Sequence, residues 1–264
     1  MPTVAIIGAG LIGCAWANVF ARAGWDVRLW DPDAKALEAA PALIGVALHD
    51  VAHNGLATDP AAAAARVKTA ASLEDAVREA DFVQENGPER VEVKQDVFAR
   101  LDAAAPPAAI LASSSSAIVA SRFTEALKGR ARCLIAHPVN PPHVVPIVEL
   151  CGAPWTSPET IARAREIYDS VGQVPITVKK EIDGFILNRM QGVLLSEAMR
   201  LVGEGFVSAE DLDKTIRDGL GLRWAFMGPF ETIELNAPGG IRDYCARYGE
   251  TLYSTSARPV TREV

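Results

Sequence analysis

The hydrophobic positions of the chain alternate between short apolar runs and longer segments with helical spacing. A run of mainly β-branched residues over 3–7 stops at glycine, and the segment after it places Trp16 and Val19 at helical spacing. A second apolar run over 25–30 then ends at Asp31. This order predicts a strand, a helix and a second strand at the start of the chain.

The same alternation continues through the first half of the chain. We expect further strands over 66–69, 81–84, 109–112, 132–136 and 147–150. We expect helices from 32 to about 51, over 73–80 and over 89–101, with an Ala-rich connection through Asp59 to Ala65. Strands that alternate with helices predict a mostly parallel sheet, and ligands of such sheets bind beyond the carboxyl ends of the strands. The loops at these ends begin at Gly8, Asp31, Glu85, Ser113 and His137.

The pattern changes near residue 180, where we place a domain boundary. Asp183 is expected to cap a helix over 184–204 that carries apolar residues around nearly its whole circumference. A helix that is apolar all round is buried, so we expect this one at a domain or subunit interface. Ser208 is expected to start the next helix, and Gly219–Gly221 to interrupt the chain.

A glycine motif connects the first predicted strand to the first predicted helix. Gly8 permits a tight turn, Gly10 lets a diphosphate approach the backbone, and Gly13 lets the helix pack closely on the strand. The helix N-terminus adds unpaired N–H groups with partial positive charge. A bare packing turn would need none of the flanking pattern. The strand, glycine motif, helix, strand and terminal acid therefore predict a dinucleotide-binding unit of the Rossmann type.

The acid at the end of the second strand indicates which dinucleotide is bound. The Asp31 carboxylate can accept hydrogen bonds from the adenosine ribose, and its charge would repel a 2′-phosphate. Arg28 and Lys35 lie nearby in the sequence and weaken that preference. The sequence therefore favours NAD over NADP as the cofactor.

Composition narrows the class of protein. Of the 264 residues, 49% are hydrophobic and 22% are charged, which is ordinary for a globular protein. A net charge of −7 without any basic cluster argues against nucleic acid as a partner. No apolar run reaches membrane-spanning length, and the run over 3–7 has no basic region before it. We therefore predict a cytoplasmic protein with neither a membrane segment nor a signal peptide.

Four cysteines lie far apart, with no spacing typical of metal ligands. They are Cys14, Cys133, Cys151 and Cys245. Their apolar surroundings predict buried, reduced thiols, and we expect no bound metal. Taken together, the patterns predict an α/β fold: a Rossmann-type doubly wound sheet over 1–180, followed by a smaller all-α domain over 181–264.

A histidine and a glutamate form the candidate catalytic pair. His137 ends a buried strand on the nucleotide side of the predicted sheet, and Glu149 interrupts the apolar strand over 147–150. A carboxylate in an apolar strand rarely lacks a partner, and the proline-rich loop between the two residues allows them to face each other. An acid bonded to one imidazole nitrogen raises the basicity of the other. The structural alternative places Glu149 on an edge strand and leaves His137 as a turn cap.

Two further polar features are candidates for contacting a ligand. The run Ser113–Ser116 follows a buried strand, where a turn needs only one serine. Asn188 lies within the mostly apolar predicted helix, where a polar side chain needs a partner. Each is explained equally well as a satisfied structural group.

These motifs together resemble the 3-hydroxyacyl-CoA dehydrogenase superfamily over nearly the whole chain. The resemblance rests on the glycine motif with Asp31, Ser113–Ser116, His137–Pro142, Val148–Leu150 and Gly184–Arg189. The serine run, His137–Pro142 and Gly219–Glu231 are similar to the lambda-crystallin / L-gulonate 3-dehydrogenase branch in particular, with carnitine dehydrogenases as close cousins of the last segment.

The resemblance implies a role for each matching residue at the reacting centre. His137 would be the general base that takes the proton of a 3-hydroxyl, and Glu149 would orient it. Ser116 and Asn188 would hydrogen-bond the reacting oxygen or the adjacent carboxylate or thioester. Independently of the resemblance, Arg223 is a candidate partner for a free substrate carboxylate, because guanidinium groups form bidentate bonds to carboxylates; a surface or interface arginine is the alternative.

The resemblance also implies cofactor contacts beyond the glycine motif. Leu11 and Ile12 would supply backbone near the pyrophosphate, and Glu89 and Lys94 would contact the nicotinamide ribose side. Without the resemblance, Glu89 and Lys94 look like a solvated helix face.

The sequence therefore predicts an NAD-dependent dehydrogenase that oxidises the 3-hydroxyl of a free acid such as L-gulonate. A 3-hydroxyacyl-CoA of fatty-acid metabolism is the second choice, because no basic cluster suited to CoA phosphates stands out, and a carnitine-type substrate is a further one. An NADH-binding structural protein, like a crystallin, is the alternative outside enzymes. Members of this branch continue for several tens of residues beyond the last residue of this chain, so a shortened C-terminal domain is expected. The resemblance also implies a homodimer.

Overall fold

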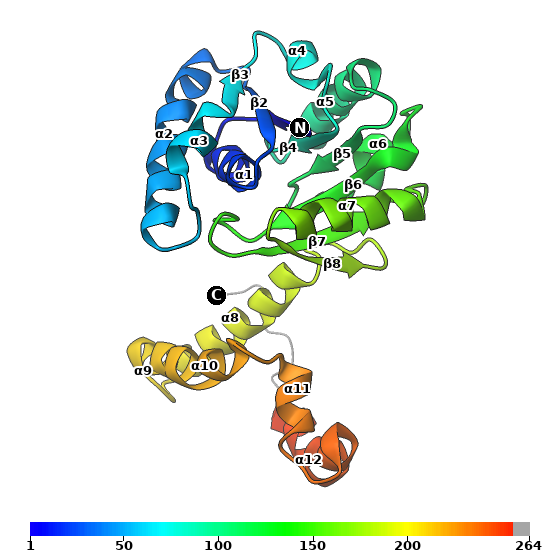
Figure 1. Cartoon of the computed structure of the whole chain (residues 1–264). Helices are drawn as coiled ribbons and strands as arrows, with labels where there is room; N and C mark the ends of the chain where they lie inside the picture. Colours follow the sequence, from blue (N-terminus) through cyan, green and yellow to red (C-terminus); the bar gives the residue numbers. More distant parts are fainter. Residues whose placement is uncertain (256–264) are drawn as a thin grey trace. The chain divides into compact units, whose positions relative to one another are not determined.

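The computed structural model describes residues 1–255. The chain divides into two compact units, Met1–Ile186 and Leu187–Val264 (Figure 1). The first unit carries all of the strands found among the described residues, and the second is helical. Within the described part, no helix is both long enough and apolar enough to cross a membrane.

The first unit is built on one eight-stranded sheet with the order β3-β2-β1-β4-β5-β6-β7-β8. The strands are β1 (Thr3–Ile7), β2 (Asp26–Trp30), β3 (Val67–Thr69), β4 (Phe82–Glu85), β5 (Ile110–Ser113), β6 (Cys133–Pro138), β7 (Ile147–Gly152) and β8 (Val174–Val178). All neighbouring strands are parallel except β6 and β7. The order reverses between β1 and β4, and ligands of doubly wound sheets bind at such a point.

Helices cover both faces of this sheet (Figure 1). One face packs against α1 (Leu11–Arg22), α2 (Ala34–His53), α3 (Pro60–Ala65) and α7 (Pro158–Ser170). The other packs against α4 (Leu73–Val77), α5 (Val91–Ala104) and α6 (Ser121–Thr124). Side chains alternate between faces along a strand, so Val4 and Ile6 join the first core while Ala5 and Ile7 join the second. The predicted doubly wound α/β fold is confirmed.

Parts of the first unit differ from the prediction. The segment 59–65, expected as an Ala-rich connection, contains α3, because the Asp59 side chain accepts a hydrogen bond from the Ala62 N–H and Pro60 occupies the first helical position. The helix α7 and the strand β8 were not predicted. They extend the sheet beyond β7, which therefore has a neighbour on each side.

The described part of the second unit consists of helices. They are α8 (Leu187–Gly203), α9 (Ala209–Thr215), a π-helical turn (Ile216–Leu220), α10 (Gly221–Trp224), α11 (Pro229–Glu234) and α12 (Gly240–Thr255). Ser208 caps α9 as predicted, and its side chain accepts a hydrogen bond from the Asp211 N–H at 3.0 Å. The prediction of an interruption at Gly219–Gly221 was wrong, because these residues lie within continuous helical backbone.

The predicted helix over 184–204 differs from α8 in its start and in its burial. Gly184 and Phe185 have φ angles of 76° and 47°, so the helix begins only at Leu187. No residue of α8 is buried in the single chain, and the side chains of Val193 and Met199 are 72% and 62% exposed. The predicted start at Gly184 was therefore wrong, and the place of this helix at a domain or subunit interface stays a prediction.

The cysteines share one chemical state but not one environment. All four are free; Cys133 and Cys151 are buried, Cys14 is half-buried and Cys245 is exposed. The expectation of four buried thiols thus holds for two of them. Burial raises the pKa of the Cys133 and Cys151 thiols to about 12, so both remain protonated at neutral pH.

Candidate active site

The predicted nucleotide loop connects β1 to α1. Gly8 has a φ of 102°, and a Cβ on Gly13 would lie 1.8 Å from the Gly8 carbonyl oxygen. A Cβ on Gly10 would meet nothing within 4 Å, which leaves open space where a pyrophosphate is expected. Among residues 1–255, no side chain caps α1, so the backbone N–H groups of its first residues, Leu11 and Ile12, are suited to an anion.

Asp31 lies directly after β2, beside this loop. Its Oδ2 accepts a hydrogen bond from the Ala9 N–H at 2.6 Å, and its Oδ1 accepts one from the Asp33 N–H at 2.8 Å. Each carboxylate oxygen has a second lone pair, which can accept a ribose hydroxyl. Arg28 instead lines a separate hollow with Asp75, so its position gives no support to binding of a 2′-phosphate.

Exchange of Asp31 for asparagine is expected to weaken NADH binding about tenfold, because a charge-assisted hydrogen bond becomes a neutral one. The ratio of kcat/KM with NADP to kcat/KM with NAD should rise in the same variant, since the repulsion of a 2′-phosphate is lost. Titration calorimetry with NADH and initial rates with both cofactors measure the two effects. Asp33→Asn is the matched control and should keep the same cofactor preference as the wild type. An unchanged preference in Asp31→Asn would contradict the prediction.

His137 and Glu149 face each other across β6 and β7. They are directly opposed in the antiparallel register, and the His137 Nδ1 lies 2.8 Å from the Glu149 Oε2. Their side chains are only 6% and 1% exposed. Since β7 lies between β6 and β8, Glu149 is not on an edge strand, and the structural alternative for this pair was wrong. With Nδ1 held by the carboxylate, Nε2 is the nitrogen left for a ligand.

Phe185 packs against this pair and was not singled out from the sequence. Its ring is fully buried, with its centroid 5.5 Å from that of the His137 imidazole. Its φ of 47° is uncommon for any residue other than glycine. In this conformation the next residue, Ile186, donates its N–H to the Glu149 Oε1 at 2.9 Å. Both carboxylate oxygens of Glu149 are therefore bonded, one of them to the imidazole.

The first residue of the serine run belongs to a buried ion pair. The Lys94 Nζ lies 2.9 Å from the Glu85 Oε2, and both side chains are 1% exposed. The Ser113 hydroxyl donates to the same Glu85 oxygen at 2.5 Å and lies 3.3 Å from the ammonium. The interpretation of Lys94 as part of a solvated helix face was therefore wrong. Its implied contact with the nicotinamide ribose stays a prediction that requires it to leave these partners.

The second serine, Ser114, contacts residues that pack against the nucleotide loop. The Ser114 hydroxyl accepts hydrogen bonds from the Trp16 Nε1 at 3.0 Å and the Gln84 Nε2 at 2.7 Å. It donates to the Asn86 Oδ1 at 2.7 Å, so its hydrogen-bonding capacity is used within the protein. Asn86 in turn lies against the loop, because a Cβ on Gly8 would lie 3.0 Å from the Asn86 carbonyl group. No sequence signal marked Asn86.

The last two serines lie in a turn that contacts Glu89. The Glu89 Oε1 accepts the Ser115 hydroxyl at 2.5 Å and the Ser116 N–H at 3.1 Å. Ser115 is buried and Ser116 is half-buried. Asn188, in the first turn of α8, and Arg223, exposed on α10, belong to the second unit, so their contacts with the candidate site stay predictions.

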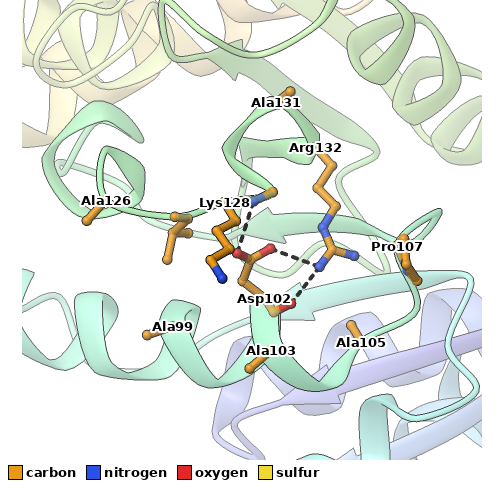
Figure 2. A pocket seen from close by; sticks show the side chains of 11 residues that line it. Ala99, Asp102, Ala103, Ala105, Pro107, Ala126, Lys128, Ala131 and Arg132 are labelled. Atoms are coloured by element: carbon orange, nitrogen blue, oxygen red, sulfur yellow. Dashed lines mark hydrogen bonds and ion pairs between the residues drawn. The ribbon is translucent and has the colours of Figure 1, made fainter.

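A pocket of about 800 Å³ lies on the side of the sheet where β6 begins, between α5 and the segment 126–132 (Figure 2). Alanine side chains form much of its lining, and the Arg132 Nη2 pairs with the Asp102 Oδ1 at 2.9 Å. Because Arg132 immediately precedes β6, the pocket lies at the amino end of that strand. His137 lies toward its carboxyl end, so this pocket is not part of the candidate site.

Comparison with known protein families covers both units. The model described as the NAD binding domain of 3-hydroxyacyl-CoA dehydrogenase matches residues 3–182. The model of the C-terminal domain of the same family matches residues 184–263.

Similar proteins include both enzymes and a crystallin. Lambda-crystallin of Oryctolagus cuniculus is 41% identical over 252 residues, which cover 94% of this chain and 79% of that protein. L-carnitine dehydrogenase of Pseudomonas putida is 40% identical over 253 residues, which cover 96% of this chain and 78% of that protein. Among solved structures, the NAD+-dependent 5-formyl-3-hydroxy-2-methylpyridine 4-carboxylic acid 5-dehydrogenase has a TM-score of 0.88 at 31% identity, over 99% of this chain and 84% of that one.

Proposed function

Because the chain belongs to the 3-hydroxyacyl-CoA dehydrogenase family, we propose that His137 is the general base with which it oxidises the 3-hydroxyl of a free hydroxy acid. The chain is an NAD-dependent dehydrogenase that acts on a hydroxyl group, as the family is. The observation that carries the proposal is the buried contact of 2.8 Å between His137 and Glu149 near the carboxyl end of β6. The glycine loop and the imidazole therefore both lie at the carboxyl ends of the strands.

The proposed proton transfer follows from this geometry. Glu149 accepts a hydrogen bond from the Nδ1–H of His137, and this tautomer leaves the lone pair of Nε2 for the substrate hydroxyl. NAD, when bound, accepts the hydride from the carbon that carries that hydroxyl. His137 takes the hydroxyl proton as the carbon–oxygen double bond forms, and Glu149 stabilises the resulting imidazolium. The Ile186 N–H and the Phe185 ring hold the carboxylate and the imidazole in place.

A free acid is the proposed substrate class, with L-gulonate as its first candidate. Arg223 is exposed and offers a bidentate partner for a free carboxylate. Two of the similar proteins are named for carnitine and for a pyridine carboxylic acid, neither of which is a thioester. A 3-hydroxyacyl-CoA is the second candidate, and the description of the family favours it.

Steady-state turnover tests the substrate class directly. The initial rate of NADH formation is measured with L-gulonate, L-carnitine, L-3-hydroxybutyrate and 3-hydroxybutyryl-CoA, each with NAD and then NADP. We expect a clear rate with a free acid and NAD. Turnover of the CoA thioester alone would overturn the free-acid assignment, whereas NADH binding without turnover of any substrate would contradict the whole proposal.

A homodimer and a cytoplasmic location complete the proposed function. The apolar side chains of α8, among them Val193 and Met199, are exposed in the single chain and offer a surface for a second copy. The free cysteines fit a reducing compartment. Sedimentation velocity tests the assembly, and a monomer at micromolar concentration would contradict it.

A further inference from the structure

Glu89 is the centre of an unusual set of hydrogen bonds. It lies in the connection between β4 and α5, and its Oε1 lies within bonding distance of four donors. These are the Ser115 hydroxyl at 2.5 Å and the backbone N–H groups of Ser116, Ala117 and Ile118 at 3.1, 2.9 and 3.0 Å. The residues 115–118, here called the serine turn, thus wind around one carboxylate oxygen.

The serine turn has the form of a backbone anion site that is filled from within the chain. Three successive N–H groups that converge on one point make a concave site for an anion. The Ile118 N–H also bonds the Ser115 Oγ at 3.0 Å, which closes the turn on itself. An ionised acceptor forms shorter and stronger hydrogen bonds than a neutral one. The shape of the turn therefore depends on the charge of the Glu89 side chain as well as on the size of that side chain.

The ionisation of Glu89 fits this geometry. Burial by itself raises the pKa of the Glu89 carboxyl, but the hydrogen bonds from Ser115, Ala117 and Ile118 and the nearby charge of Lys94 outweigh it and lower the pKa. A lowered pKa means that folding favours the carboxylate. Its stabilising contribution is complete above the pKa of the unfolded chain and is lost as the pH falls through the lowered value. At neutral pH the turn is therefore held by a full negative charge.

The serine turn begins at the carboxyl end of β5, beside β6, the strand that carries His137. It follows β5, the neighbour of β6, and Ser113 is paired with Ile135, two residues before His137. The turn carries Ser116, a candidate contact of the reacting oxygen. A displaced turn would move that contact, and a misplacement of about 1 Å at a reacting centre can lower a rate by about 10²-fold.

We propose that Glu89 is a positioning residue, whose carboxylate fixes the serine turn and thereby the place of Ser116. This inference rests on the proposed function, because it assumes that Ser116 contacts the substrate. It differs from the contact with the nicotinamide ribose that the family resemblance implied for Glu89. The two roles make different demands: positioning acts on turnover through Ser116, and a ribose contact acts on cofactor affinity.

A double-mutant cycle between Glu89 and Ser116 tests the proposal. Glu89→Gln keeps the shape and one acceptor oxygen but removes the charge. We expect kcat to fall about 30-fold, within the range for a displaced contact, while the Kd for NADH changes less than about twofold. In a Ser116→Ala background the same exchange should cost less than about twofold in kcat, because the group that it positions is gone. Glu92→Gln, an exposed carboxylate in the first turn of α5, is the matched control.

Three outcomes would overturn the positioning role. Weaker NADH binding with an unchanged kcat would assign Glu89 to the cofactor. Equal losses of kcat in the wild-type and Ser116→Ala backgrounds would show that Glu89 does not act through Ser116. Hydrogen exchange at the amides of Ser116, Ala117 and Ile118 gives a readout without turnover, and unchanged protection in Glu89→Gln would refute the anchoring itself. A wild-type protein inactive on every substrate, with faster exchange in the variant, would refute only the proposed function.

Discussion

A His137→Ala variant is expected to lose at least about 10²-fold in kcat while its affinity for NADH stays nearly unchanged. The imidazole is the proposed acceptor of the hydroxyl proton, and its removal leaves no base at the substrate hydroxyl, because Glu149 only orients the imidazole and stabilises its charged form. The glycine loop that binds the dinucleotide belongs to β1 and α1 and does not involve His137. Initial rates of NADH formation and titration of NADH by its fluorescence measure the two quantities separately.

The control for this variant is a histidine elsewhere in the same unit. His49 is exposed on α2, so His49→Ala should retain the rate of the wild type. Glu149→Gln provides a second variant of the pair, and it should also lose activity because an amide no longer fixes the imidazole tautomer. Full activity of His137→Ala would refute the proposed proton transfer, whatever the substrate.

A Lys94→Ala variant is expected to lose about 3–5 kcal/mol in the free energy of unfolding. The reason is the side chain that remains, because Glu85 is 1% exposed and would keep a buried charge without its cation. The Ser113 hydroxyl and the Gly87 N–H still donate to that carboxylate, but neither is charged. Urea unfolding followed by tryptophan fluorescence reports mainly on the unit that contains the pair, because four of the five tryptophans, among them the buried Trp16, lie in it.

A second variant separates the missing charge from the missing volume. In Lys94→Met/Glu85→Gln both charges are gone and the volumes are nearly kept, so most of the lost stability should return. Lys214→Ala removes a solvent-exposed cation and should change the unfolding free energy little. If Lys94→Ala kept the stability of the wild type but lost affinity for NADH, the buried pair would be dispensable and Lys94 would be a cofactor contact.

The nucleotide loop and the contact between His137 and Glu149 were predictable because local patterns mark them. Few residues other than glycine fit at positions 8 and 13 of this turn between strand and helix. The structure leaves no room for a Cβ on Gly13. Glu149 stood out because a carboxylate in an apolar strand requires a partner. The helix α7 was overlooked although Ser157 and Pro158 form an ordinary start signal, with the Ser157 side chain accepting the Thr160 N–H.

The support of the site was not predictable, because it depends on contacts between distant segments. Four consecutive serines look alike in the sequence. In the structure Ser113 contacts Glu85 and Lys94, whereas the hydroxyl of Ser114 contacts Trp16 on α1. Alternation of side chains along a strand separates these two environments, and only the strand order determines what each environment contains.

The proposed base and its proposed orienting acid belong to one hairpin, and this has a consequence for how the site can change during evolution. The register that opposes His137 to Glu149 is set within β6 and β7, and one residue inserted into either strand would turn the carboxylate to the other face. The loop over 139–146 lies outside that register. A change in the length of this loop would therefore leave the register of β6 and β7, and with it the contact between His137 and Glu149, in place.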